Sequence, residues 1–89
     1  MRVATAIRTK LETALDPTEL EVIDESHLHA GHVGTRPEGE SHFRIRVVSG
    51  AFESINRVAR QRLIYKALAE EMQTDIHALT IDAKAPGQG

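Results

Sequence analysis

Apolar residues recur at three- and four-residue spacings near the start of the chain, which is the period of a helix with one buried face. The apolar positions of this predicted helix are Val3, Ile7, Leu11, Ala14 and Leu15. The Asp16-Pro17 pair ends it, because the residue before a proline is disfavoured in the helical region of backbone space. From Leu20 the pattern changes to apolar residues alternating with acidic ones, which indicates a short strand with one buried face.

Two further strands and a long helix are predicted in the second half of the chain. The second strand divides its side chains between two faces, with Phe43, Ile45 and Val47 inward and His42, Arg44, Arg46 and Val48 outward. The helix covers residues 52–72, and Asn56 is a candidate N-cap because its side-chain oxygen can accept from the first turn. Its apolar positions are Val58, Ile64, Ala67, Leu68 and Met72. The last strand covers residues 76–83, with Leu79 and Ile81 facing inward.

The predicted order is therefore α-β-β-α-β, with an additional helical turn near residues 51–55, in a single α+β domain over residues 1–89. We expect the first two strands to pair antiparallel, and the second and third, joined by a helical crossover, to pair parallel. All helices then cover one face of a three-stranded mixed sheet, whose open face carries the two arginines of the second strand. The ordered core is expected over about residues 3–84, with a frayed tail after it.

Composition excludes several classes of protein. With no cysteine among 89 residues, the chain has no disulfide and no thiolate of its own to act as a nucleophile or metal ligand. Its first residues carry charges every few positions, and no apolar run reaches membrane-spanning length, so we expect a cytoplasmic protein with no membrane partner. No nucleophile-elbow, zinc-protease or phosphate-loop motif occurs, and an enzyme is the least expected class.

Charge is distributed unevenly, although the net charge is only −2. Residues 41–66 carry six basic side chains and one acidic, which gives +5, whereas residues 1–40 carry −4 and residues 67–89 carry −3. A basic middle between acidic ends can seat an acidic partner, a nucleic-acid backbone or the protein's own carboxylates.

The basic side chains of the long helix point to two different sides. Arg62 and Lys66 continue to Glu70 as a charged stripe with four-residue spacing. Arg60 instead points toward the apolar side, where a buried charge requires a partner. That partner is either structural, as a carboxylate or backbone carbonyls, or it belongs to another protein or a nucleic acid.

Five histidines are unusual for 89 residues. Three of them, His27, His29 and His32, lie in residues 26–40, which glycines and the lack of periodicity predict to be a long exposed loop. Neutral imidazole is a common nitrogen ligand for transition metals, so this spacing can wrap an ion, but solvated loop histidines are the simpler explanation. His77 stands at the start of the last strand, where a half-buried histidine can also cap the core through a hydrogen bond.

An ordered set of short motifs extends this interpretation. They are Ser41-His42-Phe43, Val47-Val48-Ser49, Phe52-Glu53, the run from Val58 through Arg60 and Arg62 to Tyr65, and Ile76-His77-Ala78-Leu79. In this order, over residues 20–86, the chain resembles the BolA family. The resemblance implies a KH-like fold, in agreement with the α-β-β-α-β order. It also implies two roles, namely sharing a [2Fe–2S] cluster with a monothiol glutaredoxin and binding DNA as a transcriptional regulator.

The resemblance also implies metal ligands. By position, the family's C-terminal histidine corresponds to His77 and its loop ligand to His32, with His29 as a second candidate. The chain departs from the family at Gln61, where the family has a histidine, and at Ser54, where it has a glycine. It also lacks the family's C-terminal tryptophan. These departures leave both predicted ligands in place.

Three hypotheses follow. The first is a non-enzymatic partner of a monothiol glutaredoxin in [2Fe–2S] cluster handling or iron sensing, in which the thiolates come from the partner and its thiol cofactor. The second is a DNA-binding regulator, and the third is an adaptor without metal. The side chains assigned to partner or nucleic-acid contact are Arg57, Arg60, Arg62 and Lys66. The acidic ends and the lack of base-stacking aromatics on the outward strand face favour the first hypothesis over the second.

Overall fold

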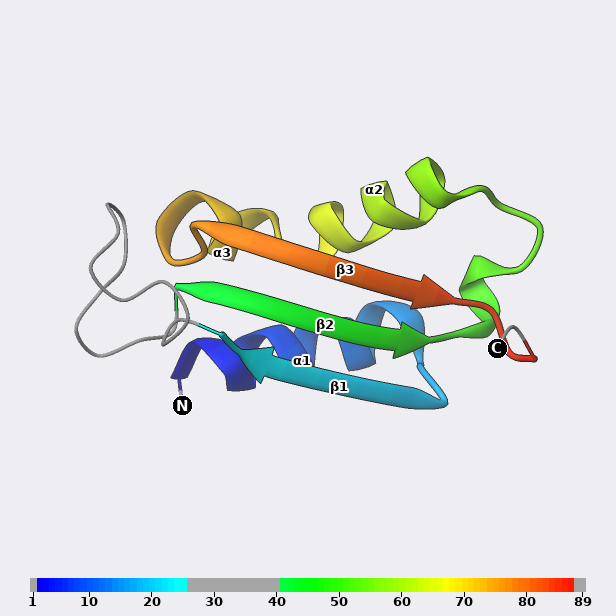
Figure 1. Ribbon diagram of the computed structural model, residues 1–89, viewed down its shortest axis with the longest axis horizontal. Helices are drawn as coiled ribbons and strands as arrows, with labels where there is room; N and C mark the ends of the chain where they lie inside the picture. The colour runs from blue at the N-terminus through cyan, green and yellow to red at the C-terminus, as the bar shows by residue number, and fades with distance from the viewer. Residues whose placement is uncertain (1, 26–40, 88–89) are drawn as a thin grey trace.

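The computed structural model of the chain describes residues 2–25 and 41–87. Its elements, labelled in Figure 1, are α1 (Arg2–Leu15), β1 (Glu19–Asp24), β2 (His42–Val48), the 3-10 turn η2 (Gly50–Phe52), α2 (Arg57–Ala67), α3 (Ala69–Thr74) and β3 (Ala78–Lys84). Within these residues the strands form one sheet in the order β1-β2-β3, so β2 is central. β1 pairs antiparallel with β2, and β2 pairs parallel with β3, as predicted.

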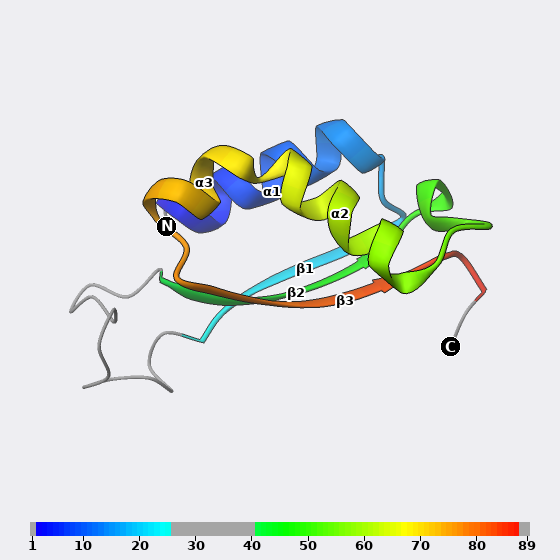
Figure 2. The same cartoon turned by 90° about the horizontal axis from the view of Figure 1, so that it is seen from above.

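The helices all cover one face of this sheet, which Figure 2 shows in profile. α1 packs against the side of the sheet formed by β1 and β2, and the crossover helices α2 and α3 lie on the side of β3 (Figures 1 and 2). The α+β class, the mixed three-stranded sheet and the single helical layer are therefore confirmed. The additional turn expected near residues 51–55 is present as η2, one residue earlier.

The hydrophobic core lies between the helical layer and the sheet. Its fully or almost fully buried side chains are Val3, Ile7, Leu11 and Leu15 of α1, Phe43, Ile45 and Val47 of β2, and Phe52, Ile64 and Leu68 of the crossover. Two side chains predicted to be buried are instead exposed, namely Ala14 and Val58. Both lie in a terminal turn of their helix, and Val58 is also roughly 120° around α2 from the buried Ile64.

The single helix predicted over residues 52–72 is wrong, because the chain leaves the helical conformation twice. Ser54 has a φ of +66°, in the left-handed region, which separates η2 from α2. Asn56 then caps α2 as predicted, its side-chain oxygen accepting from the Ala59 N–H at 2.9 Å. At Leu68 the backbone turns to φ −105° and ψ 16°, and α3 begins with the next residue.

The last strand begins two residues later than predicted and extends further. Ile76 is buried at 5% exposure, but it precedes β3 rather than belonging to it. Lys84 ends β3, and the following Ala85 is buried at 6% exposure. Among the described residues no helix is long and apolar enough to cross a membrane.

Candidate metal-ligand and partner site

The backbone around His77 is held by hydrogen bonds at every step. At the end of α3, the N–H groups of Asp75 and Ile76 both donate to the Glu71 carbonyl, at 2.8 and 2.9 Å. The His77 N–H then donates to the Ser41 carbonyl at 2.7 Å. The buried Ile76 side chain anchors the same turn in the core. His77 itself is exposed, so the structure does not bear out the alternative of a half-buried histidine that caps the core.

His42 lies beside His77, because β2 and β3 run parallel with His42 opposite Ala78. The two imidazole rings stack with 6.1 Å between their centroids and 19° between their planes. His42 is buried at 9% exposure, and its Nδ1 is hydrogen-bonded to the Ser41 hydroxyl at 2.8 Å. Sequence reasoning placed His42 on the open face of the sheet and missed this pair. A signal for this pair was available in the sequence. The predicted parallel pairing of the second and third strands brings together the two motifs that contain His42 and His77.

His27, His29 and His32 lie outside the described residues, so their roles as loop ligands stay predictions. The residues that flank their segment are described. Glu25 donates its N–H to the His42 carbonyl at 2.8 Å, and Ser41 holds His77. The chain therefore enters and leaves residues 26–40 next to His42 and His77.

The donor chemistry of His77 suits a transition metal, because an exposed neutral imidazole is a good nitrogen ligand. Across residues 2–25 and 41–87, no group of three or more His, Cys, Asp or Glu side chains is placed to hold a metal ion. His77 thus fits the role of one ligand in a site completed by other residues or another protein.

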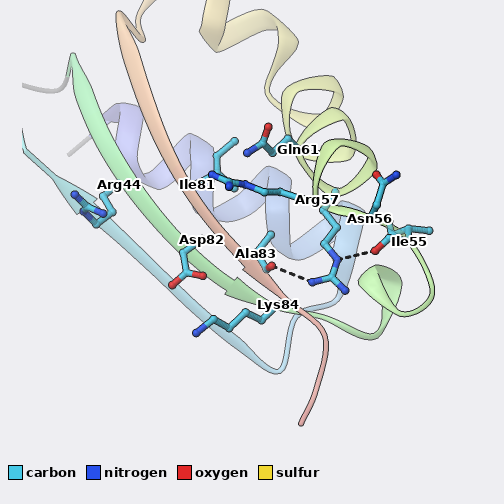
Figure 3. A pocket seen from close by; sticks show the side chains of 10 residues that line it. Arg44, Ile55, Asn56, Arg57, Gln61, Ile81, Asp82, Ala83 and Lys84 are labelled. Carbon is cyan, nitrogen blue, oxygen red and sulfur yellow. Dashed lines mark hydrogen bonds between the residues drawn. The ribbon is translucent and has the colours of Figure 1, made fainter. Parts of the chain in front are cut away.

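Arg60 is engaged inside the molecule. Its Nε donates to the Ile55 carbonyl at 3.0 Å and its Nη1 to the Ala83 carbonyl at 3.2 Å, the two bonds dashed in Figure 3. Its guanidinium also lies 5.9 Å from the centroid of the Phe52 ring, within range of a cation–π contact. Of the partners considered for Arg60, backbone carbonyls of this chain are the ones observed. A further role of Arg60 in partner contact stays a prediction.

A groove of about 580 Å³ opens between the first half of α2 and β3 (Figure 3). Asn56, Arg57 and Gln61 line it from the helical side, and Ile81 and Ala83 line it from the strand. Besides Arg57 and Arg60, its lining includes Arg44 and Lys84, with Asp82 as its acidic member. The groove is therefore predominantly basic.

The outer face of α2 combines cations with exposed apolar side chains. Val58, Arg62 and Tyr65 follow one another at spacings of four and three residues, and Lys66 adjoins them. Val58 is 54% exposed and Tyr65 41% exposed. Within the described part of the chain, Arg57, Arg62 and Lys66 form no ion pair. Among residues 2–25 and 41–87, the outer face of α2 is therefore a basic surface whose cations have no carboxylate partner.

The open face of the sheet differs, because its arginines are paired with carboxylates. Arg44 Nε lies 3.0 Å from Glu25 Oε2. Arg46 lies 3.5 Å from both Glu21 on β1 and Asp82 on β3. Two of the six basic side chains of residues 41–66 are therefore paired with carboxylates on the sheet, and the other four lie on α2.

Ion pairs also join α1 to α3, next to the turn that carries His77. Lys10 Nζ lies 2.7 Å from Glu71 Oε2 and 3.6 Å from Glu70 Oε1, and Arg2 lies 3.1 Å from Asp75. The hydrogen bond to Glu71, more than the charges of Glu71 and Glu70, raises the pKa of Lys10 above its ordinary value of 10.5. Glu71 is buried, and its other oxygen, Oε1, has no hydrogen-bond partner among the described residues.

Comparison with known proteins places this arrangement in a family. Residues 11–88 match the sequence pattern of BolA-like proteins. The chain is 50% identical over 86 residues to SufE-like protein 1, chloroplastic/mitochondrial, of Arabidopsis thaliana, covering 92% of this chain and 23% of that protein. It is 49% identical over 86 residues to human BolA-like protein 1, covering 97% of this chain and 60% of that protein. The chain thus spans only part of the length of both relatives.

A solved structure agrees with the sequence match. The structure of BolA1 from Arabidopsis thaliana superposes with a TM-score of 0.85 at 40% identity, covering 98% of this chain and 95% of that one. The predicted resemblance is therefore confirmed over the described fold as well as the sequence. The chain belongs to the BolA family.

Proposed function

We propose that this chain is a non-enzymatic partner of a monothiol glutaredoxin and contributes His77 as a ligand to a [2Fe–2S] cluster that the two proteins share. One observation carries the proposal, namely an exposed imidazole on a turn whose backbone is fixed by Glu71 and Ser41. A ligand held in this way loses little conformational freedom when it binds a metal.

The donor set supports a shared site rather than one held by this chain alone. The chain has no cysteine, so the thiolates of the cluster come from the partner and its thiol cofactor. His32, with His29 as the second candidate, supplies the other imidazole in this proposal. When bound, a cluster with two imidazole ligands has a higher reduction potential than one with thiolates alone. Iron sensing and cluster handling are the two uses that this chemistry supports.

The first test is recovery of the partner from cells. The full chain carrying an affinity tag is purified without oxygen from its own host, and the absorption spectrum of the eluate is recorded before its proteins are identified. We expect a monothiol glutaredoxin and visible absorption in the same fraction. Recovery of that partner without any absorption at full iron supply supports the adaptor hypothesis instead.

DNA binding is the second candidate function, and the outer face of α2 favours it, because its cations Arg62 and Lys66 lack carboxylate partners among the described residues. Cations that contact phosphate release counterions, so each contact contributes about 0.9 to the slope of log affinity against log salt. If α2 binds DNA, Arg62→Gln should reduce the magnitude of this slope by about 0.9, the contribution of one phosphate contact. Arg46→Gln, on the ion-paired sheet, should leave the slope unchanged. Equal slopes for both variants would exclude this surface.

The location of the protein is also a proposal. We propose a cytoplasmic location for this chain. The name of one relative, SufE-like protein 1, places that protein in chloroplasts and mitochondria. Fractionation of host cells with an antibody to this chain distinguishes the compartments.

A further inference from the structure

We propose that His42 is a positioning residue, which holds the His77 imidazole in one orientation at the end of the sheet. Its effect on the cluster rests on the proposed function, whereas the restraint of His77 by His42 can be measured in the isolated protein. His42 acts through His77 and has no assigned contact with metal.

The burial of His42 supports this role. It is one of four polar or charged residues that are buried among the described residues, and the adjacent Ser41 is another. A buried imidazole loses its hydration and requires a hydrogen-bond partner, which the Ser41 hydroxyl provides at 2.8 Å from Nδ1. This bond fixes the rotation of the His42 ring, which would otherwise be broad. His42 therefore presents a ring plane of defined orientation to its neighbour.

Ser41 restrains His77 in two ways at once. Its carbonyl accepts the N–H of His77 at 2.7 Å, and that of Ala78 at 3.4 Å, which fixes the backbone. Its hydroxyl fixes the His42 ring, and that ring stacks on the His77 side chain with only 19° between the planes. Ser41, whose exposure is 0%, therefore restrains the backbone of His77 directly and its side chain through His42.

The stack matters because His77 is otherwise exposed and, as an exposed side chain, would sample several rotamers. Aromatic pairs prefer centroid distances of about 4.5–7 Å, so the observed 6.1 Å is an attractive contact. If the His77 ring is already restricted before the metal binds, less conformational entropy is lost on binding. His42 thus prepares a ligand without being one.

Two variants of matched size separate the ring from the volume that it fills. His42→Leu keeps an apolar side chain of similar size but removes the ring and the bond to Ser41. His42→Phe keeps a ring that can stack. In the isolated protein at one fixed pH, NMR coupling constants and ring-to-ring nuclear Overhauser effects report the rotamer of His77.

We expect one dominant His77 rotamer in the natural protein and in His42→Phe, and averaged couplings in His42→Leu, with the amide signals of Ile45 and Leu79 unchanged in all three. Unaltered His77 couplings in His42→Leu overturn the proposal. Averaged couplings in His42→Phe also overturn it, since stacking would then not be the restraint. If His42→Leu does not fold, His42→Met replaces it, because methionine also fills the volume without a ring; averaged couplings are again expected, and unaltered couplings would again contradict the proposal.

A second measurement separates this inference from the proposed function. The heterodimer with a cluster-loaded monothiol glutaredoxin is titrated, and the visible signal assigned to His77 reports its formation. His42→Leu should lower the apparent affinity in this titration by about two- to tenfold, which corresponds to the energy of an aromatic pair. His42→Phe should restore it. If His77→Ala abolishes the signal but His42→Leu leaves it intact, the positioning role fails and the proposed function stands. If the natural protein gives no signal, the proposed function fails while the NMR result still decides the restraint on His77.

Discussion

Arg60 shows how a single side chain connects the crossover to the last strand. It is half-buried, and its two hydrogen bonds reach Ile55 before α2 and Ala83 in β3, which are 28 residues apart in sequence. A planar guanidinium can donate in both directions at once, whereas an ammonium group cannot reproduce this geometry. Arg60 therefore ties the start of α2 to the edge of the sheet.

Replacing Arg60 should consequently destabilise the fold. We expect Arg60→Ala to lower the free energy of unfolding by about 1–3 kcal/mol, because two carbonyls lose a charged donor. Arg60→Lys should recover only part of this loss. The control is Arg62→Ala on the outer face of α2, which should change stability by no more than about 0.5 kcal/mol. Urea unfolding of the four proteins gives the comparison, and equal values for the two alanine variants would contradict the assignment.

Ser54 has a backbone conformation that the sequence pattern could not reveal directly. Its φ of +66° costs a residue with a side chain about 1–2 kcal/mol, whereas glycine adopts it freely. The family's glycine at this position was the available signal, because an expected glycine indicates a left-handed turn. Periodicity alone extended the helix through it.

Substitution at Ser54 should reflect this strain. We expect Ser54→Gly to leave stability unchanged or raise it by up to about 1 kcal/mol, since relief of the left-handed strain exceeds or equals the extra freedom of the unfolded chain. Ser54→Val should lower stability by about 1–2 kcal/mol, because a β-branched side chain fits this region poorly. Thermal unfolding measures both, and a valine variant as stable as the natural protein would show that Ser54 is not strained.

At the scale of elements, regular patterns predicted the fold, and tertiary context determined what they missed. Alternation identified β1 and β2, and the helical period identified α1, because each of these elements buries one face. The break at Leu68 has no signal in spacing, since Leu68 is buried with or without it. The stacking partner of His42 is His77, which is 35 residues away in sequence and becomes its neighbour only through the parallel register.

The contact between α1 and α3 should make stability depend on pH in the alkaline range. Since the pKa of Lys10 is raised in the folded state, its bond to Glu71 stabilises the fold fully below the unfolded value of 10.5. This contribution is lost as pH rises through the higher folded value. We therefore expect the stability difference between the natural protein and Glu71→Gln to be constant near neutral pH and to shrink above 10.5.

Glu70→Gln provides the matched control for this contact. Glu70 is exposed and 3.6 Å from Lys10, so its variant should show a smaller difference with the same direction. Denaturant unfolding at a series of pH values measures both variants. A Glu71→Gln difference that persists unchanged above the folded pKa of Lys10 would mean that the ion pair does not cause it.

At the scale of the whole molecule, charge and chemistry are separated. The arginines of the sheet are paired with carboxylates, whereas Arg62 and Lys66 of α2 have no such partner among the described residues. His77 directly precedes β3, whereas the contact between Arg60 and Ala83 lies near the end of that strand. The family resemblance predicts His77 as a ligand, whereas the hydrogen bonds that hold its backbone could be seen only in the structure.

The most direct test of this account is the visible absorption and circular dichroism of a heterodimer formed with a cluster-loaded monothiol glutaredoxin. We expect the spectrum to differ from that of the glutaredoxin alone, and His77→Ala to abolish the difference without unfolding, because an exposed side chain contributes little to stability. His27→Ala is the histidine control and should change little, while His32→Ala, or else His29→Ala, should weaken the signal. An unchanged heterodimer spectrum in His77→Ala would contradict the account.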